Sequence, residues 1–259
     1  MTSIDTWVAH FENNPAHHRT LEATIAWTAR PTLSGRARRA FVHSFQRFEL
    51  GEGGEGTRLL SLAAAAGDPT YTQALRLLVQ EEQKHSALFE RGLRHLDAPT
   101  LNSHWSDAAF TRLRHLLGLR AEIGLFLIAE SVAMGYFIAL AESAPDPVLR
   151  GIGRRIAEDE RNHIRFQIDR LRVGFRQTPA PLRLVIGLGW TVIAAGAAAV
   201  LVVDHRAALR ACGIAPLQYW GRAMRSFRVA AHSALARSGG TLLGPRAVAD
   251  RSPDPASTA

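Results

Sequence analysis

Two glutamate–histidine pairs in this sequence have a spacing that suits a metal ion. Glu160 and His163 are three positions apart, and Glu82 and His85 repeat that spacing 78 positions earlier. Residues three positions apart lie on the same face of a helix, about one turn from each other. A carboxylate and an imidazole placed in this way can hold one metal ion between them, so the repeated pair predicts a metal centre.

The same offset relates further residues, which indicates the internal duplication of a helical hairpin. Asp68-Pro69 corresponds to Asp146-Pro147, and Glu52 corresponds to Glu130. Each copy therefore supplies one glutamate, a turn at Asp-Pro and one Glu-x-x-His pair. Glu55 lies about one turn from Glu52 on nearly the same helix face and is the reserve candidate.

Glu130 is the candidate ligand with the strongest support from its surroundings. It lies in the almost wholly apolar stretch IGLFLIAESVAMGYFIAL. A lone carboxylate inside such a helix is costly unless it is paired or bound to a metal ion. The same stretch holds three residues that either line a substrate pocket or pack in the core: Phe126, Met134 and Tyr136.

Three other acids are candidates for an outer layer that holds the imidazoles in place. Glu81 and Asp159 directly precede the glutamates of the two pairs. Carboxylates next to metal-binding histidines often fix the imidazole tautomer, and a position on the surface is the alternative for both acids. Glu122 either joins this outer layer or pairs with an arginine.

This inventory resembles that of the ferritin-like di-iron carboxylate superfamily over about residues 35–175. In that superfamily, two helices each give a glutamate and two others each give a Glu-x-x-His pair, all pointing into a four-helix bundle. The resemblance implies an all-α, ferritin-like four-helix bundle, built here from the duplicated hairpin. It also implies two iron ions, with manganese as the alternative, held by these ligands: Glu52, Glu82, His85, Glu130, Glu160 and His163.

The superfamily contains storage proteins, peroxidases, oxidases, desaturases and hydroxylases, and the motif alone does not choose among them. The apolar segment 184–203, which a storage ferritin does not need, favours an oxidoreductase: an O2-dependent oxidase or monooxygenase acting on a hydrophobic small molecule. The sequence has no evident nucleotide-binding motif, so electrons are expected from a separate donor. One alternative is iron handling or peroxide removal, as in ferritins and rubrerythrins, although the single cysteine, Cys212, leaves no rubredoxin-type cluster. The other alternative is a non-enzymatic helical protein that associates with membranes or partners.

Four long helices are expected in the bundle, with boundaries set by glycine, proline and capping residues. They cover residues 34–66, 68–96, 107–143 and 146–175. The glycines of LGEGGEG, residues 50–56, either let a neighbour approach the metal or break the first helix. His115, in the third helix, is not expected to be a ligand.

The chain divides into four parts. Residues 1–34 form a lead-in helix expected to cover one end of the bundle, with His17-His18 exposed to solvent, and residues 35–178 form the di-metal domain. Residues 179–238 give an apolar helix followed by basic amphipathic helices, and the composition of residues 239–259 predicts a disordered tail.

Residues 184–203 carry no charge and are long enough to span a bilayer. Three interpretations remain open: a buried fifth helix, a membrane-embedded or interfacial anchor, and a homodimer interface. The net charge of +8 suits contact with anionic lipid, whereas the absence of arginines interleaved with aromatic residues argues against nucleic acid. Without a signal-peptide pattern, we expect a cytoplasmic protein, peripheral or embedded at the inner membrane face.

Overall fold

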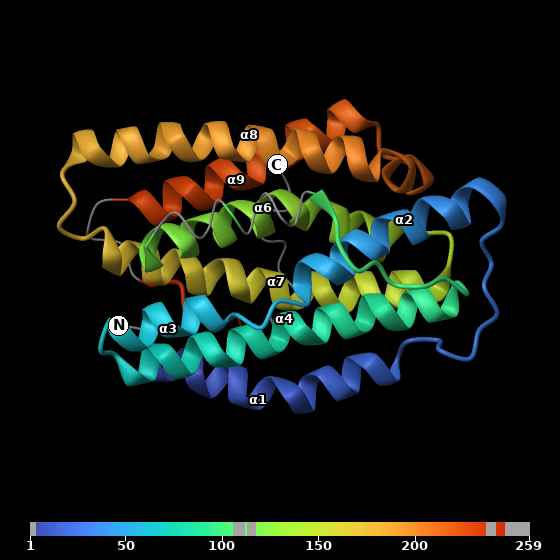
Figure 1. Ribbon diagram of the computed structural model, residues 1–259, viewed down its shortest axis with the longest axis horizontal. Helices are drawn as coiled ribbons and strands as arrows, with labels where there is room; N and C mark the ends of the chain where they lie inside the picture. Colours follow the sequence, from blue (N-terminus) through green and yellow to red (C-terminus); the bar gives the residue numbers. More distant parts are fainter. Residues whose placement is uncertain (1–3, 106–111, 113–117, 237–241, 247–259) are drawn as a thin grey trace.

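The computed structural model describes residues 4–105, 112, 118–236 and 242–246 of the 259-residue chain. In these residues the regular structure is all helical, which confirms the predicted class (Figure 1). The helices are α1 (Ile4–Ala23), α2 (Gly35–Glu52), α3 (Thr57–Ala65), α4 (Pro69–His95), α6 (Leu119–Ser143), α7 (Pro147–Gly174), α8 (Ala180–Ala211) and α9 (Pro216–Leu235). His115 and the expected helix start at residue 107 lie outside the described residues.

The two helices that carry the Glu-x-x-His pairs begin in the same way. Asp68 precedes α4, and its carboxylate accepts a hydrogen bond from the N–H of Tyr71 at 2.9 Å. Asp146 precedes α7 and accepts from the N–H groups of Val148 and Leu149. A proline follows each aspartate, where a missing N–H does no harm, so the repeated Asp-Pro sequence sets both helix starts.

The expected continuous helix over residues 34–66 is wrong, because the chain leaves the helix after Glu52. Glycines occupy three of the four positions between α2 and α3, and Gly56 has a left-handed φ of +63°. Glycine adopts that conformation without strain and weakens a helix by about 1 kcal/mol relative to alanine. The break places Glu52 at the last residue of α2 and leaves Glu55 exposed in the connection.

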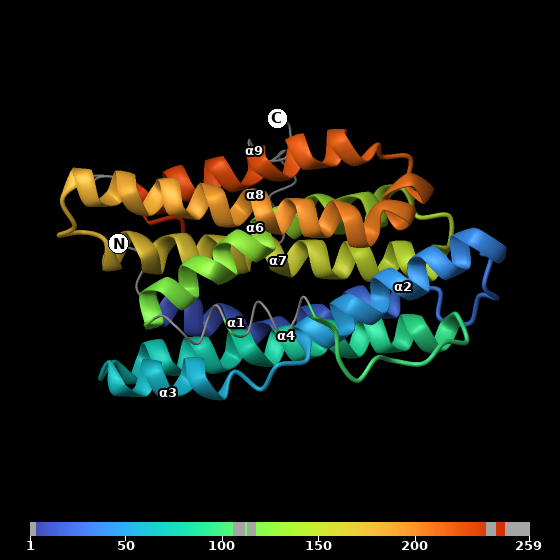
Figure 2. The ribbon, with the colours of Figure 1, turned by 45° about the horizontal axis from the view of Figure 1, so that its top comes forward.

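The helices pack in layers along one long axis (Figures 1 and 2). α6 packs on α7, α2 packs on α4, and α4 faces α7. α1 lies along α4 and α7, so the expectation that it covers one end of the bundle is wrong. α8 and α9 form a pair on the other side, against α6. This arrangement brings the two helices with Glu-x-x-His pairs face to face.

α6 and α7 approach each other closely at Gly153. A Cβ at this glycine would lie 2.6 Å from the backbone nitrogen of Ala141, so no other residue fits without a shift.

The three candidate pocket residues of α6 lie in or against the core. Tyr136 and Met134 are buried, and Phe126 packs against the core from a partly buried position. All three therefore have a packing role, and their place in a substrate pocket stays a prediction.

Two described helices, α6 and α8, are long and apolar enough to cross a membrane. The apolar sequence of α6 is explained by its position in the core, because 72% of an 18-residue apolar segment of this helix is buried. Only 22% of the corresponding 18-residue segment of α8 is buried. The interpretation of residues 184–203 as a buried helix therefore holds for one face only.

Part of the expected disordered tail is in contact with α7. The N–H groups of Leu243 and Gly244 donate hydrogen bonds to Asp169 at 2.7 and 2.9 Å. The indole N–H of Trp7 in α1 donates to the same carboxylate at 3.2 Å. These contacts could not be predicted from the composition of the segment, because they are made by backbone N–H groups, which every non-proline residue has.

Candidate metal centre

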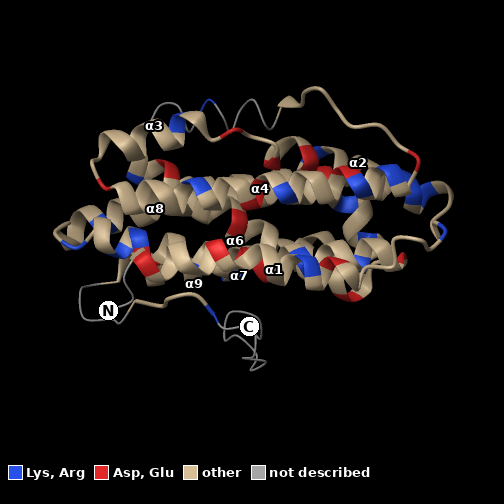
Figure 3. Cartoon of the chain, turned by 90° about the horizontal axis from the view of Figure 1, so that it is seen from below, with Lys and Arg blue, Asp and Glu red and all other residues tan. Residues whose placement is uncertain are grey.

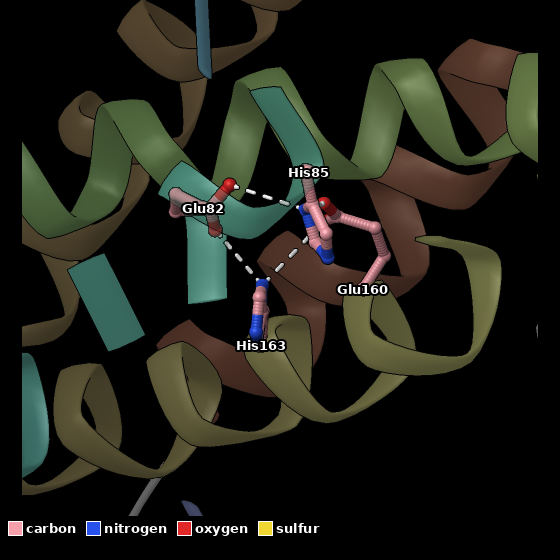
Figure 4. A group of neighbouring side chains, drawn as sticks. All are labelled: Glu82, His85, Glu160 and His163. Carbon is pink, nitrogen blue, oxygen red and sulfur yellow. Dashed lines mark ion pairs between the residues drawn. The ribbon is translucent and has the colours of Figure 1, made fainter. Parts of the chain in front are cut away.

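The two Glu-x-x-His pairs meet between α4 and α7. One ligand atom from each of Glu82, His85, Glu160 and His163 lies within 4.8 Å of the others (Figure 4). Nδ1 of His163 is 2.8 Å from Glu82, and Nδ1 of His85 is 3.3 Å from Glu160 and 3.6 Å from Glu82. Three of the four side chains are buried and Glu82 is mostly buried. These four residues form a group that could hold a metal ion.

The other two predicted ligands lie beside this group. The carboxyl group of Glu52, at the end of α2, has a pKa that is raised by burial and by the charge of Glu82, whose carboxyl group lies close by. Glu130 in α6 is buried close to Glu160 and Glu82, and its carboxylate accepts a hydrogen bond from the side-chain amide of Gln167. Four helices therefore contribute to one cluster. Figure 3 shows acidic residues midway along the molecule, between its two rows of helices.

Glu55 and Glu122 have other surroundings. Glu55 is exposed, and its carboxylate accepts a hydrogen bond from the hydroxyl of Thr57, so the reserve candidate does not reach the cluster. Glu122 is fully buried and forms an ion pair with Arg58 of α3 at 3.8 Å. Of the two predicted roles for Glu122, the structure supports the pairing with an arginine.

Each imidazole of the cluster is held by an acid of the opposite helix. Nε2 of His85 in α4 is 3.0 Å from Asp159 in α7, and Nε2 of His163 in α7 is 2.9 Å from Glu81 in α4. Both acids are buried, so the alternative of a surface position is excluded. An Nε2–H bonded to a carboxylate leaves Nδ1 without a proton and free to bind a metal ion. In both histidines that Nδ1 atom faces the cluster.

α1 adds a further layer that the sequence reasoning missed. The side-chain amide of Asn14 donates a hydrogen bond to Glu81 at 2.9 Å, and Nε2 of His18 is 3.1 Å from Asp159. The expectation of an exposed His17-His18 pair is wrong: His18 is buried, and the partly buried His17 is 3.0 Å from Glu158. A signal was present in the sequence, because positions 7, 11, 14 and 18 lie on one helix face.

His18, Glu81 and Asp159 form a second group with the composition of metal ligands. Their carboxylates already have partners: Asn14 and His163 bond Glu81, while His85 and Arg155 bond Asp159. The two carboxylates of this group are therefore already satisfied by neighbouring side chains. Their effect is to fix the imidazoles of the first group from outside.

Three of the four acids of the cluster have raised pKa values, and Glu82 is the exception. Burial, followed by repulsion from Glu82, raises the pKa values of Glu52 and Glu160, and burial and the charge of Glu160 raise that of Glu130. Burial acts the same way on Glu82, but contact with His163 and His85 lowers its pKa well below the usual range. Glu82 is thus the carboxylate that carries negative charge most readily.

The imidazoles respond to the same charges in the opposite sense. Burial disfavours imidazolium and acts to lower the pKa values of both histidines. Contact with the surrounding carboxylates outweighs burial and raises the pKa of His85. The charge of Glu82 and contact with Glu81 raise the pKa of His163 in the same way. Without a metal ion, protons must offset part of the buried negative charge. A divalent cation supplies the same compensation without protons.

The donor atoms of the cluster fit a metal ion. Five residues present buried atoms to the cluster that make no well-aligned hydrogen bond within the described part of the chain, although some lie close to each other: Glu82 Oε1, His85 Nδ1, Glu130 Oε2, Glu160 Oε1 and Oε2, and His163 Nδ1. Unsatisfied buried polar atoms are rare, and an ion is one recognised explanation. Oxygen and imidazole nitrogen donors without thiolates suit iron or manganese.

We expect His18→Ala to weaken metal binding by about 10- to 100-fold, the usual effect of losing an outer partner. The imidazole of His18 contacts Asp159, which in turn fixes His85. Affinity for ferrous iron or manganese can be measured by competition with a chromogenic chelator. His17→Ala is the matched control on the adjacent residue, and equal affinities for the two variants would contradict the bracing role.

The chain matches no protein-family model, no curated protein and no solved structure. The described part of the chain has only helices as regular structure and contains a buried cluster of carboxylates and histidines that could hold a metal ion.

Proposed function

We propose that this protein is a di-iron carboxylate oxidoreductase that uses O2 to oxidise a hydrophobic small molecule. One observation carries the proposal. Two imidazoles, each held through Nε2 by an acid of the facing helix, direct their Nδ1 atoms at a common group of carboxylates. The proposal is supported by the resemblance of these donors to those of ferritin-like di-iron sites, in which a four-helix bundle contributes a glutamate or a Glu-x-x-His pair from each helix.

The residues would divide the work of holding two ions. His85 and His163 would hold the ions through Nδ1, and Glu82 and Glu160 would supply carboxylate ligands from the same two helices. Glu52 and Glu130 would complete the ligand set from α2 and α6. When bound, a pair of iron ions supplies redox chemistry toward O2.

The residues around the cluster favour oxidation chemistry because they limit the access of water to the metal centre. Phe11 lies with its ring centroid 6.1 Å from that of His163, and the buried Gln167 holds Glu130. Apolar walls around a metal centre exclude water and limit side reactions. Phe126, Met134 and Tyr136 remain candidate pocket residues, and a separate protein is proposed as the electron donor.

The test is to load the full-length protein with ferrous iron without oxygen, remove loose metal and count the iron per chain. Two irons per chain and a rapid oxygen-dependent absorbance change support the proposal. Iron that continues to accumulate far beyond two per chain would instead favour iron handling. A protein that retains neither iron nor manganese would sink the di-metal proposal and leave a helical interaction protein.

A further inference from the structure

The outer side of the α8–α9 layer carries a stripe of exposed apolar side chains. On α8 the exposed fractions are 65% for Leu184, 59% for Leu188, 73% for Val192 and 65% for Val203. Their spacing keeps them within one face of the helix. Large exposed apolar patches are rare on soluble monomers and mark interaction sites.

Exposed arginines occur on the adjacent helix α9 and in the last turns of α8. The exposed face of α9 carries three of them at intervals of three residues, and two more end the stripe on α8: Arg222, Arg225, Arg228, Arg206 and Arg210. α9 contains no acid, and the one acid of α8, Asp204, lies 3.9 Å from Arg47. The side chains of these five arginines and of Leu184, Leu188, Val192 and Val203 define the α8–α9 surface. α8 and α9 run side by side in both ribbon views (Figures 1 and 2).

We propose that the α8–α9 surface docks on a bilayer face that contains anionic lipids, with α8 lying in the plane of the interface. Apolar side chains enter the boundary between headgroups and acyl chains, while arginines alongside bind lipid phosphates. Trp220 of α9 is 39% exposed, and tryptophan is enriched at this depth of a membrane. The inference goes beyond the proposed oxidoreductase activity and does not depend on it.

Charge distinguishes this occupant from a second copy of the chain. A twofold dimer through the α8–α9 surface would place the same patch of each copy against the other. Five arginines would then face five arginines, with Asp204 as the one acid of α8 and already engaged by Arg47. Like charges brought together in this way oppose association, whereas an anionic lipid surface complements them.

The packing of α8 also separates docking from a membrane crossing. Its inner face carries Trp190 against α6 so tightly that a Cβ on Gly124 would lie 2.6 Å from the indole ring. Farther along, Nδ1 of His205 is 2.6 Å from the hydroxyl of Ser44 in α2, and burial lowers the pKa of His205 to about 3. A crossing would break these contacts, whereas docking uses side chains that are already exposed.

The test is co-sedimentation of the full-length protein with vesicles of phosphatidylcholine, with and without phosphatidylglycerol. We expect binding to the anionic vesicles, weakened by added salt. The triple variant Arg222→Gln/Arg225→Gln/Arg228→Gln should bind about 100-fold less, at about fivefold per arginine near the surface. The variant Leu188→Ser/Val192→Ser should lose at least about tenfold through its reduced apolar area.

A matched control has the same loss of charge elsewhere: Arg30→Gln/Arg36→Gln/Arg39→Gln, three exposed arginines outside α8 and α9. It should bind like the unaltered protein. Equal binding by the two triple variants would overturn the proposal. The proposal would also be overturned if the protein did not bind anionic vesicles and analytical ultracentrifugation showed a dimer that the Val192→Asp substitution dissociates. Because iron content is measured separately, failure of docking is distinguishable from failure of the oxidoreductase proposal.

Discussion

Glu82→Gln is expected to abolish stable metal binding while leaving the protein folded. Glu82 lies 2.8 Å from Nδ1 of His163 and 3.6 Å from Nδ1 of His85, and the surrounding imidazoles keep its pKa low. The glutamine amide has nearly the shape of the glutamate carboxylate but lacks the negative charge with which the carboxylate would bind a metal ion. The loss of affinity should exceed the roughly 10- to 100-fold typical of an outer partner. Metal content after anaerobic loading and desalting measures it.

Glu55→Gln is the matched control for this experiment. Glu55 is exposed, lies outside the cluster and undergoes the same chemical change. It should retain the iron or manganese content of the unaltered protein. Full metal content in the Glu82→Gln protein would show that the cluster is not the binding site.

Glu130→Gln is expected to reverse its effect on stability when metal is added. Burial and neighbouring acids raise the pKa of Glu130, so the metal-free protein bears the cost of a carboxylate in unfavourable surroundings. An amide removes that cost and can still accept the hydrogen bond from Gln167. In the presence of a chelator, the free energy of unfolding should rise by about 1–3 kcal/mol. With saturating metal, the unaltered protein should be the more stable of the two.

The pH dependence of this difference follows from the raised pKa. A carboxyl group with a raised pKa binds more protons in the folded protein than in the unfolded chain, so the stability of the metal-free protein falls as pH rises above the ordinary value of 4.5. The gain from Glu130→Gln should therefore be largest near neutral pH and vanish as pH falls toward 4.5. Thermal unfolding across this range measures it, and a difference independent of pH would contradict the assignment of cause.

Local patterns in the sequence predicted what depends on single helices. The Asp-Pro starts of α4 and α7 and the one-face spacing of Glu82 with His85 follow from neighbouring residues alone. The duplication also selected Glu52 over Glu55 without any structure, and the two residues do lie in different surroundings. The roles of the predicted ligands in metal binding remain to be tested.

Other features depended on contacts between distant parts of the chain. Helical spacing places His18 on the buried face of α1, but its partner Asp159 lies 141 positions later in the chain, and no local rule reveals such a partner. The glycines of residues 50–56 left two interpretations open, a close approach to the metal and a break in the helix, and the structure shows the break. The half-exposed state of α8 could not be predicted either, since its apolar sequence suits a buried helix and a surface helix equally.

The position of α1 has a consequence for the order of assembly. α1 lies far before α7 in the chain, yet it docks on this later helix: Trp7 contacts Asp169, and His18 contacts Asp159. Such distant pairings form late, because a long loop must close first. We therefore expect the nascent protein to pass through a stage in which α4 and α7 are paired but α1 is undocked. During that stage one side of the cluster is uncovered, which gives an incoming ion a route that closes when folding is complete.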